Sequence, residues 1–178
     1  MLVLSYRKLR YGYTFRRILL TQGKYAIVDP DDYDWLSKNK WHAANNGNTY
    51  YAIRSRWSKT EKRKITISMH RLIIDVPDDM FVDHINHNGL DNRKANLRLV
   101  TCTQNNWNNR KRKRKSSSRY KGIHWNKMRK RWKAKIQVNG KRRFIGYFDD
   151  EIEAAKAYDE AAKKYYGEFA VLNFESEI

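Results

Sequence analysis

Cysteine and long apolar runs are nearly absent from this sequence. Cys102 is the single cysteine, so neither an intramolecular disulfide nor a cysteine-rich zinc ribbon is available. The first 20 residues interrupt their apolar side chains with Arg or Lys every few positions, which fits neither a secretory leader nor a membrane span. We therefore expect a cytoplasmic protein with no membrane partner, and no obligate protein partner is evident.

Acidic residues are scarce, and in one stretch they are missing. The 178 residues include 38 Lys and Arg but 19 Asp and Glu, a net charge of +19. Residues 110–143 contain 17 cations and no acid, whereas residues 144–178 contain 3 cations and 9 acids. A cationic block fits a polyanion, because each neutralised phosphate releases condensed counterions. The alternative is a solvated basic face with no dedicated partner.

The segment RKRKRKSSSR, residues 110–119, predicts a domain boundary. Consecutive cations repel one another, and the serines that follow offer nothing to bury. With 40% hydrophobic and 32% charged residues, two small cores are more plausible than one large core. We expect a first domain over residues 1–109, a basic linker over 110–119 and a second domain over 120–178.

In the first part, patterning predicts a mixed α+β fold. KYAIVD, NTYYAIRSRW and KITIS have the alternation of strands, and DDYDWLSKNKW suits a short helix capped by Asp side chains. VDHIN and LRLVT indicate two short strands separated by a loop rich in Gly, Asn and Asp. TQNNWNNRKRK then predicts a helix with Thr103 as its N-cap, which gives the order strand, loop, strand, helix.

In the last part, we predict a three-stranded antiparallel sheet packed on one helix. GIHWN, RWKAKIQV and RRFIGYF are strand-like, and Asn139-Gly140 between the last two is a strong hairpin signal. DDEIEAAKAYDEAAKKYYGEF predicts an amphipathic helix that ends at Gly167. The residues expected near its buried face are Ile152, Ala155, Ala162 and Tyr166.

Asp83, His84 and Asn105 have the residue types that phosphodiester hydrolysis needs. A neutral imidazole can take a proton from water, and carboxylate and amide oxygens suit a hard cation such as Mg²⁺. Adjacent strand residues point to opposite faces, so Asp83 and His84 can serve one site only where the strand ends or bulges. The alternative is that Asp83 and the asparagines only cap turns.

VDHINHNGLDNRKANLRLVT followed by QNNWN resembles the HNH endonucleases of phage and intron-encoded homing type. The resemblance implies a ββα-metal fold around one divalent ion, Mg²⁺ with Mn²⁺ as the alternative. It assigns His84 as general base, Asp83 and Asn105 as metal ligands, and Asn96 as the amide that fixes the loop holding His84. His70, in MHRL, matches a histidine often found ahead of the motif, and a packed structural histidine is the alternative.

His87 stands where such relatives often carry glycine, so we give it no catalytic role. No ligand of the motif is missing, and the sequence shows no sign of a dead site.

Residues 120–174 resemble the DNA-binding domain of plant ethylene-response factors, the Apetala type, through YKGI, RWKAKI, IGYF, AAKAYDEAA and VLNF. In that family a three-stranded sheet enters the major groove. The family tends to carry Arg where His124 and Asn126 stand, so the resemblance alone does not imply the family's usual GC-rich target here. Packing is the alternative role for Trp125, Trp132 and Phe144. The positions aligned with family contacts are Lys121, His124, Asn126, Trp132, Lys135 and Arg143.

The run of six cations before the serines is expected to follow the phosphate backbone, with a nuclear-localisation signal as the competing interpretation. It consists of Arg110, Lys111, Arg112, Lys113, Arg114 and Lys115.

Together these features predict a metal-dependent endonuclease that nicks or cuts double-stranded DNA and is targeted by its C-terminal domain. The resemblance implies a bacterial or phage-infected host cell, where the protein would associate with the nucleoid. The alternatives are a transcriptional regulator that binds DNA without cutting it and, less favoured, an RNA-binding protein.

Overall fold

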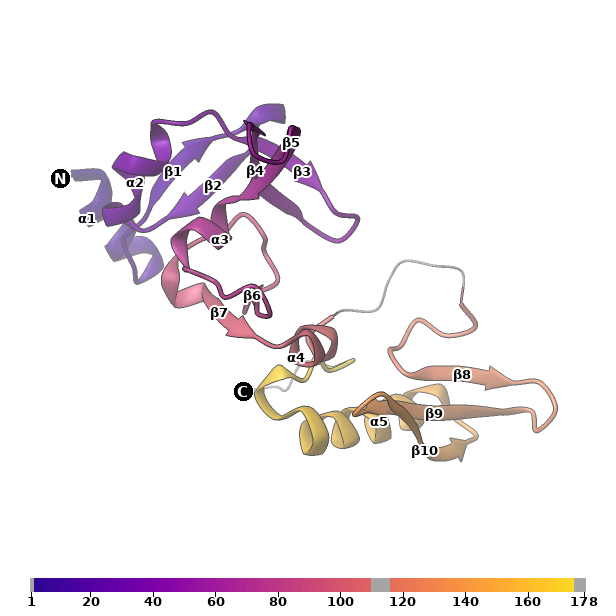
Figure 1. Cartoon of the computed structure of the whole chain (residues 1–178). Helices are drawn as coiled ribbons and strands as arrows, with labels where there is room; N and C mark the ends of the chain where they lie inside the picture. The colour runs from indigo at the N-terminus through magenta and orange to yellow at the C-terminus, as the bar shows by residue number, and fades with distance from the viewer. Residues whose placement is uncertain (1, 110–115, 175–178) are drawn as a thin grey trace. The chain divides into compact units, whose positions relative to one another are not determined.

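The computed structural model describes residues 2–109 and 116–174 and divides the chain into two compact units, Met1–Val100 and Thr101–Ile178 (Figure 1). Several small sheets and helices confirm the expected mixed α and β character. The first unit ends at residue 100, before the expected end at residue 109, so the helix after LRLVT belongs to the second unit. The cationic run Arg110–Lys115 lies outside the described residues.

The first unit contains two two-stranded sheets and one three-stranded sheet, all antiparallel. Their order is β1-β2, β3-β4-β5 and β6-β7. The elements in chain order are α1 (Leu2–Tyr11), β1 (Arg16–Leu19), the 3-10 helix η1 (Thr21–Gly23), β2 (Tyr25–Val28), α2 (Pro30–Ser37), β3 (His42–Asn45), β4 (Tyr50–Ser58), β5 (Arg63–Ser68), α3 (Met69–Ile73), β6 (Phe81–His84), η2 (Lys94–Asn96) and β7 (Leu97–Val100).

The core of the first unit forms where β1–β2, α2, α3 and β3–β4 meet. Leu36 and Met69 are fully buried there, and the indole Nε1 of Trp41 donates to the Leu36 carbonyl at 2.9 Å. Apolar residues from the predicted strands KYAIVD and NTYYAIRSRW supply the facing side chains. The segment that sequence analysis treated as a lead-in is therefore the body that supports the β6–β7 hairpin.

The second unit begins with α4 (Cys102–Trp107), whose N-cap is Thr101 and not the predicted Thr103. Thr101 has extended backbone angles, which a cap needs, and its hydroxyl accepts from the Gln104 amide at 3.2 Å. The Gln104 side-chain oxygen accepts from the Thr101 amide at 2.8 Å, which completes a capping box. Thr103 lies within the first helical turn and cannot serve as the cap.

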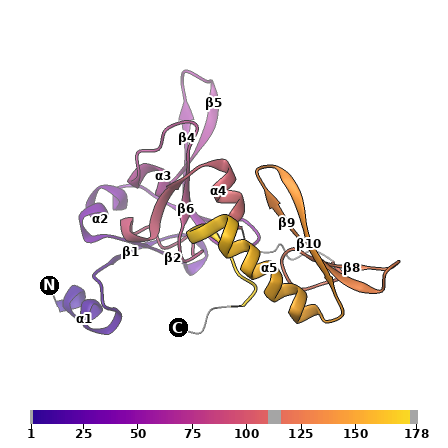
Figure 2. The same ribbon diagram turned by 90° about the horizontal axis from the view of Figure 1, so that it is seen from below.

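The rest of the second unit is a three-stranded antiparallel sheet in the order β10-β9-β8, with α5 along one face (Figure 2). Asn139 and Gly140 join β9 to β10 with positive φ angles of 50° and 75°, the backbone that the hairpin signal requires. The elements are β8 (Ile123–Asn126), β9 (Arg131–Val138), β10 (Lys141–Phe148), α5 (Glu151–Tyr166) and η3 (Gly167–Phe169).

The face of α5 that packs on the sheet differs in part from the prediction. Ala155, Ala162 and Tyr166 are buried as expected, but Ile152 is 42% exposed and Tyr158 takes part in the core instead. Ile152 belongs to the first turn of α5, where Asp150 caps the helix through two backbone amides. The helix therefore starts beyond the edge of the core.

Two of the three serines in the predicted linker are integral to the second unit. Ser118 is buried, and its hydroxyl accepts from the Tyr120 amide at 2.9 Å. The hydroxyl of Ser117 accepts from the Trp125 amide at 3.0 Å. Small hydroxyl side chains satisfy these backbone donors at the start of the sheet, so the ordered unit extends into the predicted linker.

Candidate functional site

Strand β6 ends at His84, so the Asp83-His84 pair lies where the strand gives way to a loop. Asp83 lies opposite Arg98 on β7, and its Oδ2 accepts from Arg98 Nε at 3.0 Å. His84 Nε2 lies 3.4 Å from Asn92 Oδ1 in the loop. Both side chains are buried, at 9% and 4% exposure, and they have different partners, as adjacent strand residues should.

Two rings from distant parts of the first unit lie beside the His84 ring. Its ring centroid lies 5.1 Å from that of His70 on α3 and 5.6 Å from that of Tyr51 on β4. His70 and Tyr51 are themselves 5.6 Å apart. The imidazole of His84 therefore forms a three-ring cluster with two rings that the local Asp-His motif does not contain.

Burial decides the protonation of both histidines. It lowers the pKa of His84, although the hydrogen bond to Asn92 and the charges of Asp83 and Asp91 oppose the effect. The pKa of His70 falls to about 3 through burial, with the neighbouring His84 and Arg71 adding to the effect. Both imidazoles are thus neutral near pH 7, and a neutral imidazole can accept a proton.

The side chain of Asn96 ties together the loop that follows His84. Its Nδ2 donates to the Asp91 carbonyl at 2.7 Å and to Asn86 Oδ1 at 3.0 Å. Its Oδ1 accepts from the Asn86 amide at 3.0 Å. Asn96 is 6% exposed, so these bonds are sheltered from water and hold the loop closed on itself.

The same loop is also fastened to the rest of the first unit. The Asn92 amide donates to the Ile27 carbonyl on β2 at 2.7 Å, and the Lys94 amide donates to Asp29 Oδ2 at 2.8 Å. Helix α2 begins at Pro30, so Asp31 and Asp32, which were expected to cap it, lie in its first turn instead. Its N-cap residue, Asp29, makes no side-chain bond to the helix, because its carboxylate bonds to the loop. His87 has a φ of 60°, in the left-handed region that glycine adopts most readily.

Asn105, the second predicted metal ligand, lies on α4 in the second unit. The first unit therefore brings together Asp83, His84, Asn96 and His70, while Asn105 belongs to a separate body. Within residues 2–109 and 116–174, no group of three His, Cys, Asp or Glu side chains forms a metal-binding cluster.

The register of the C-terminal sheet divides the predicted DNA-contact residues between its two faces. Lys135 lies opposite Phe144, and alternate residues Ala134 and Ile136 are buried against α5, so Lys135 is on the face away from that helix. We call this surface the open face. His124 and Asn126 share it, because they lie opposite Lys133 and Arg131.

Trp132 and Arg143 belong to the other face. Trp132 lies opposite Trp125 and Phe148 and packs against the core. Arg143 lies opposite Ile136, and its guanidinium is 5.4 Å from the Tyr165 ring of α5. Their positions favour packing over the predicted contacts with DNA.

Lys121 is also turned away from solvent. Its ammonium donates to the Trp107 carbonyl of α4 at 2.8 Å, and burial lowers its pKa to about 8. The Lys121 side chain therefore connects α4 to the β8–β10 sheet.

Three residues of the open face, Lys133, Arg142 and Tyr147, were missed by sequence analysis. Phe144, for which packing was the alternative role, is 55% exposed and lies 4.9 Å from the Tyr147 ring. The ammonium of Lys133 is 5.5 Å from the Phe144 ring, and Arg142 lies opposite Gln137. Counting outward from Asn139-Gly140 would have found this face, because a two-residue turn fixes which residues oppose each other.

At the histidine site, the missed residues are Tyr51, Asn92 and Arg98. Tyr51 lies 33 positions before His84, and only the folded sheets bring it close. Asn92 stands inside the quoted DNRKANLR element, and Arg98 becomes visible once the β6–β7 register is known.

Comparisons with known proteins match both parts of the chain. The family model for HNH endonucleases matches residues 75–107, which span the Asp-His pair, Asn96 and Asn105. An uncharacterized HNH endonuclease of Acanthamoeba polyphaga mimivirus is 33% identical over 154 residues, which cover 85% of this chain and 76% of that protein. Protein 3.8 of Escherichia phage T7 is 30% identical over 95 residues, 53% of this chain and 77% of that protein.

These similarities define the class of the protein as a nuclease of the HNH type. The chain belongs to the HNH endonuclease family.

A separate, shorter similarity covers the C-terminal part. APETALA2-like protein 2 of Oryza sativa is 44% identical over 63 residues, which are 34% of this chain but 14% of that protein. The share of the plant protein is small, so this match bears on one segment only. Within the described residues, no helix combines the length and apolar character needed to span a membrane.

Proposed function

We propose that this protein is a metal-dependent endonuclease that hydrolyses phosphodiester bonds in double-stranded DNA, with its β8–β10 sheet directing it to target sites. The main support is the buried, neutral imidazole of His84 at the end of β6, inside the segment that the HNH endonuclease family matches. The viral and phage relatives lead us to propose that it acts on DNA in an infected cell.

In this proposal His84 is the general base. An amide oxygen can only accept, so the contact with Asn92 Oδ1 uses the N–H of Nε2 and leaves the lone pair on Nδ1. Nδ1 then accepts the proton of the water that attacks phosphorus, and the bond to the 3′ oxygen breaks to leave a 5′-phosphate. Asn96 keeps the loop in the shape that orients His84.

The donor set suits a hard divalent ion, Mg²⁺ or Mn²⁺. Asp83 supplies a carboxylate in the first unit, an oxygen donor of the kind such ions prefer, and Asn105 stays a proposed ligand through the matched family segment alone. Arg98 contacts Asp83 Oδ2 and orients its carboxylate. An ion held at Asp83 would stabilise negative charge on the phosphate and on the leaving oxygen.

The open face of the sheet is the proposed DNA-reading surface. It combines cations such as Lys133, Lys135 and Arg142 with the exposed ring of Phe144, a mixture that suits phosphates and base edges. His124 and Asn126 lie on the same face and remain proposed contacts. The similarity to the APETALA2-like protein supports a DNA-binding role for this segment.

Cleavage of supercoiled plasmid tests the proposal. Wild-type protein, His84→Ala and a control, His42→Ala, are incubated with Mg²⁺ or with EDTA. His42 lies on an exposed position of β3. We expect wild type and the control to nick or linearise the plasmid only with Mg²⁺, and His84→Ala to be slower by about 100-fold or more.

Duplex binding, measured in EDTA, should be the same for all three proteins within about twofold, because His84 is a buried residue of the first unit and is not part of the open face. Cleavage by His84→Ala at the wild-type rate would remove this histidine from the mechanism. Binding by all three proteins without cleavage by any, on a substrate that contains a selected target, would favour the regulator that binds DNA without cutting it.

A further inference from the structure

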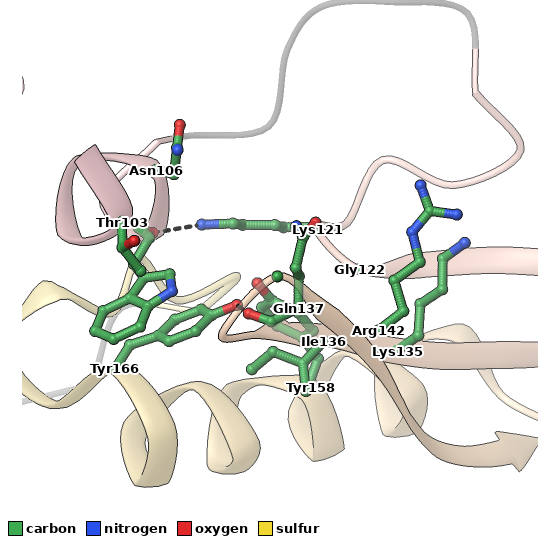
Figure 3. A pocket seen from close by; sticks show the side chains of 12 residues that line it. Thr103, Asn106, Lys121, Gly122, Lys135, Ile136, Gln137, Arg142, Tyr158 and Tyr166 are labelled. Atoms are coloured by element: carbon green, nitrogen blue, oxygen red, sulfur yellow. Dashed lines mark hydrogen bonds between the residues drawn. The ribbon is translucent and has the colours of Figure 1, made fainter.

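A pocket of about 590 Å³ lies within the second unit, where α4 meets the hairpin end of the sheet (Figure 3). Trp107 and Asn106 line it from α4, and Lys121 lines it from the segment before β8. Lys135 on β9 and Arg142 on β10 line it from the sheet. Neither the HNH motif nor the proposed catalytic residues include this pocket.

The lining is strongly positive. It contains three cations, Lys121, Lys135 and Arg142, and no Asp or Glu. Figure 3 shows the side chains of Lys135 and Arg142 pointing the same way from neighbouring strands. Among the described residues, neither has an acidic partner within ion-pair distance. Lys135 and Arg142 repel each other, and a bound anion would offset that repulsion.

The titration of the lysines agrees with this arrangement. Burial lowers the pKa of Lys135, and the charges of Arg142 and Lys133 lower it further. The pKa of Lys121 falls to about 8 through burial, although Asp159 opposes the effect. A bound anion would raise both pKa values, because it favours the charged form of each ammonium.

The pocket wall on the α4 side is fixed before any ligand arrives. The Trp107 ring stacks on Tyr166 of α5, with centroids 4.8 Å apart and planes 16° apart. The Trp107 carbonyl accepts one of the three ammonium protons of Lys121, which leaves others for a ligand. Amide side chains of Asn106 and Gln137 add donors to the lining.

We propose that this pocket binds a phosphate group, with Arg142 and Lys135 on one side, Lys121 on another and the Asn106 amide contributed by α4. A guanidinium and an ammonium are the usual donors to phosphate oxygens, and charge-assisted bonds of this kind are strong. The phosphate belongs either to the backbone of a bound duplex or to a free nucleotide. The first source deepens the proposed DNA binding, and the second does not depend on it.

The test uses the full chain in EDTA, where no cleavage complicates binding. Inorganic phosphate, thymidine 5′-monophosphate and a short duplex without terminal phosphates are titrated separately. Affinity is measured by calorimetry, and the side-chain signals of Asn106, Gln137 and Trp107 are followed by NMR. Arg142→Gln and Asn106→Ala probe the pocket. Lys141→Gln is the matched control, because this neighbouring cation does not line the pocket.

We expect at least one probe to shift all three signals, and Arg142→Gln to weaken that probe by about tenfold while Lys141→Gln changes it less than about twofold. Shifts with the duplex identify a backbone phosphate, and shifts only with the small probes identify a free nucleotide. In the duplex case Asn106→Ala also lowers affinity.

Two results would overturn the inference. One is the absence of shifts with every probe. The other is duplex binding that Arg142→Gln weakens while Asn106→Ala and the α4 signals do not change. In that case the open face binds DNA without the pocket, so the proposed function survives and the pocket proposal does not.

Discussion

The imidazole rings of His70 and His84 meet edge to face, with centroids 5.1 Å apart and an interplanar angle of 84°. Burial keeps both rings neutral, and a charge on His84 makes it harder for His70 to gain a proton. His70 Nδ1 is buried and has no hydrogen-bond partner among the described residues. The pair therefore makes the first unit sensitive to acid.

Replacing His70 by Phe should reduce this sensitivity. The pKa of His70 is about 3 in the folded protein and about 6.5 in an unfolded chain, so only the unfolded chain takes up this proton between those values. The stability that neutral His70 contributes is complete above pH 6.5 and is lost as pH falls toward 3. Between pH 7 and pH 4 we expect His70→Phe to lose about 2 to 3 kcal/mol less than wild type.

Urea unfolding at several pH values measures the difference, with His42→Phe as the control for loss of an exposed histidine. Identical acid profiles for wild type and His70→Phe would show that His70 titrates normally.

Gly89 allows the loop to pass close to β4, and we expect Gly89→Ala to disturb the site. A Cβ at this position would lie 2.5 Å from the Tyr50 carbonyl oxygen and 2.7 Å from the Tyr51 ring. The loop must shift, which we expect to cost about 1 to 3 kcal/mol and to slow cleavage, because Tyr51 borders His84. Thermal unfolding and cleavage rate are the measurements.

The double variant Gly89→Ala with Tyr51→Ala separates the two clashes. Removing the ring relieves one clash and leaves the backbone oxygen, so the two changes should be less costly together than their sum. Strict additivity would mean that the ring and the loop do not meet in solution.

We expect Asn96 to contribute more to stability than an exposed asparagine does. Asn96→Ala removes three hydrogen bonds and leaves the Asn86 amide and the Asp91 carbonyl without this partner, so we expect a loss of about 2 to 4 kcal/mol. Asn96→Asp can still accept from the Asn86 amide but cannot donate to the Asp91 carbonyl, and should fall between.

Denaturant unfolding gives the order, and Asn45→Ala, on an exposed position, is the control. Cleavage by Asn96→Ala should also fall at temperatures where the protein is folded, because the loop positions His84. A variant with normal stability and a slow rate would instead give Asn96 a direct part in the chemistry.

Local signals in the sequence predicted local structure well. Asn139-Gly140 predicted the hairpin because both positions need positive φ, and strand alternation located β6 and β7 around their loop. The cap of α4 was wrong by two residues: both candidates are threonines, but only Thr101 has a Gln three residues later, the spacing of the capping box that forms. Motif spacing found the Asp-His pair without its neighbours.

What could not be predicted depends on pairing across long distances. Tyr51 reaches His84 through the packing of separate sheets, and no local pattern marks that contact. Asn105 follows the motif in sequence but folds with the second unit, because Trp107 on the same helix stacks on Tyr166. The apolar contact of Trp107, rather than the polar motif residue Asn105, decides which unit α4 belongs to.

The assignment of Lys133 and Arg143 to opposite faces of the sheet yields the last prediction. Lys133 is on the open face beside Phe144, whereas Arg143 lies over the Tyr165 ring of α5. Both substitutions to Ala remove one positive charge, so any difference between them reports position rather than net charge. Lys133→Ala should weaken duplex binding about 3- to 10-fold at low salt and reduce the slope of log affinity against log salt by about 1. Arg143→Ala should change the slope by much less, and should instead lower the free energy of unfolding by about 0.5 kcal/mol through loss of the stacking on Tyr165.

Fluorescence anisotropy over a salt series, with urea unfolding of both variants, measures these effects. Equal slopes for the two variants would mean that the duplex does not distinguish the faces, and the open face would then no longer be the reading surface.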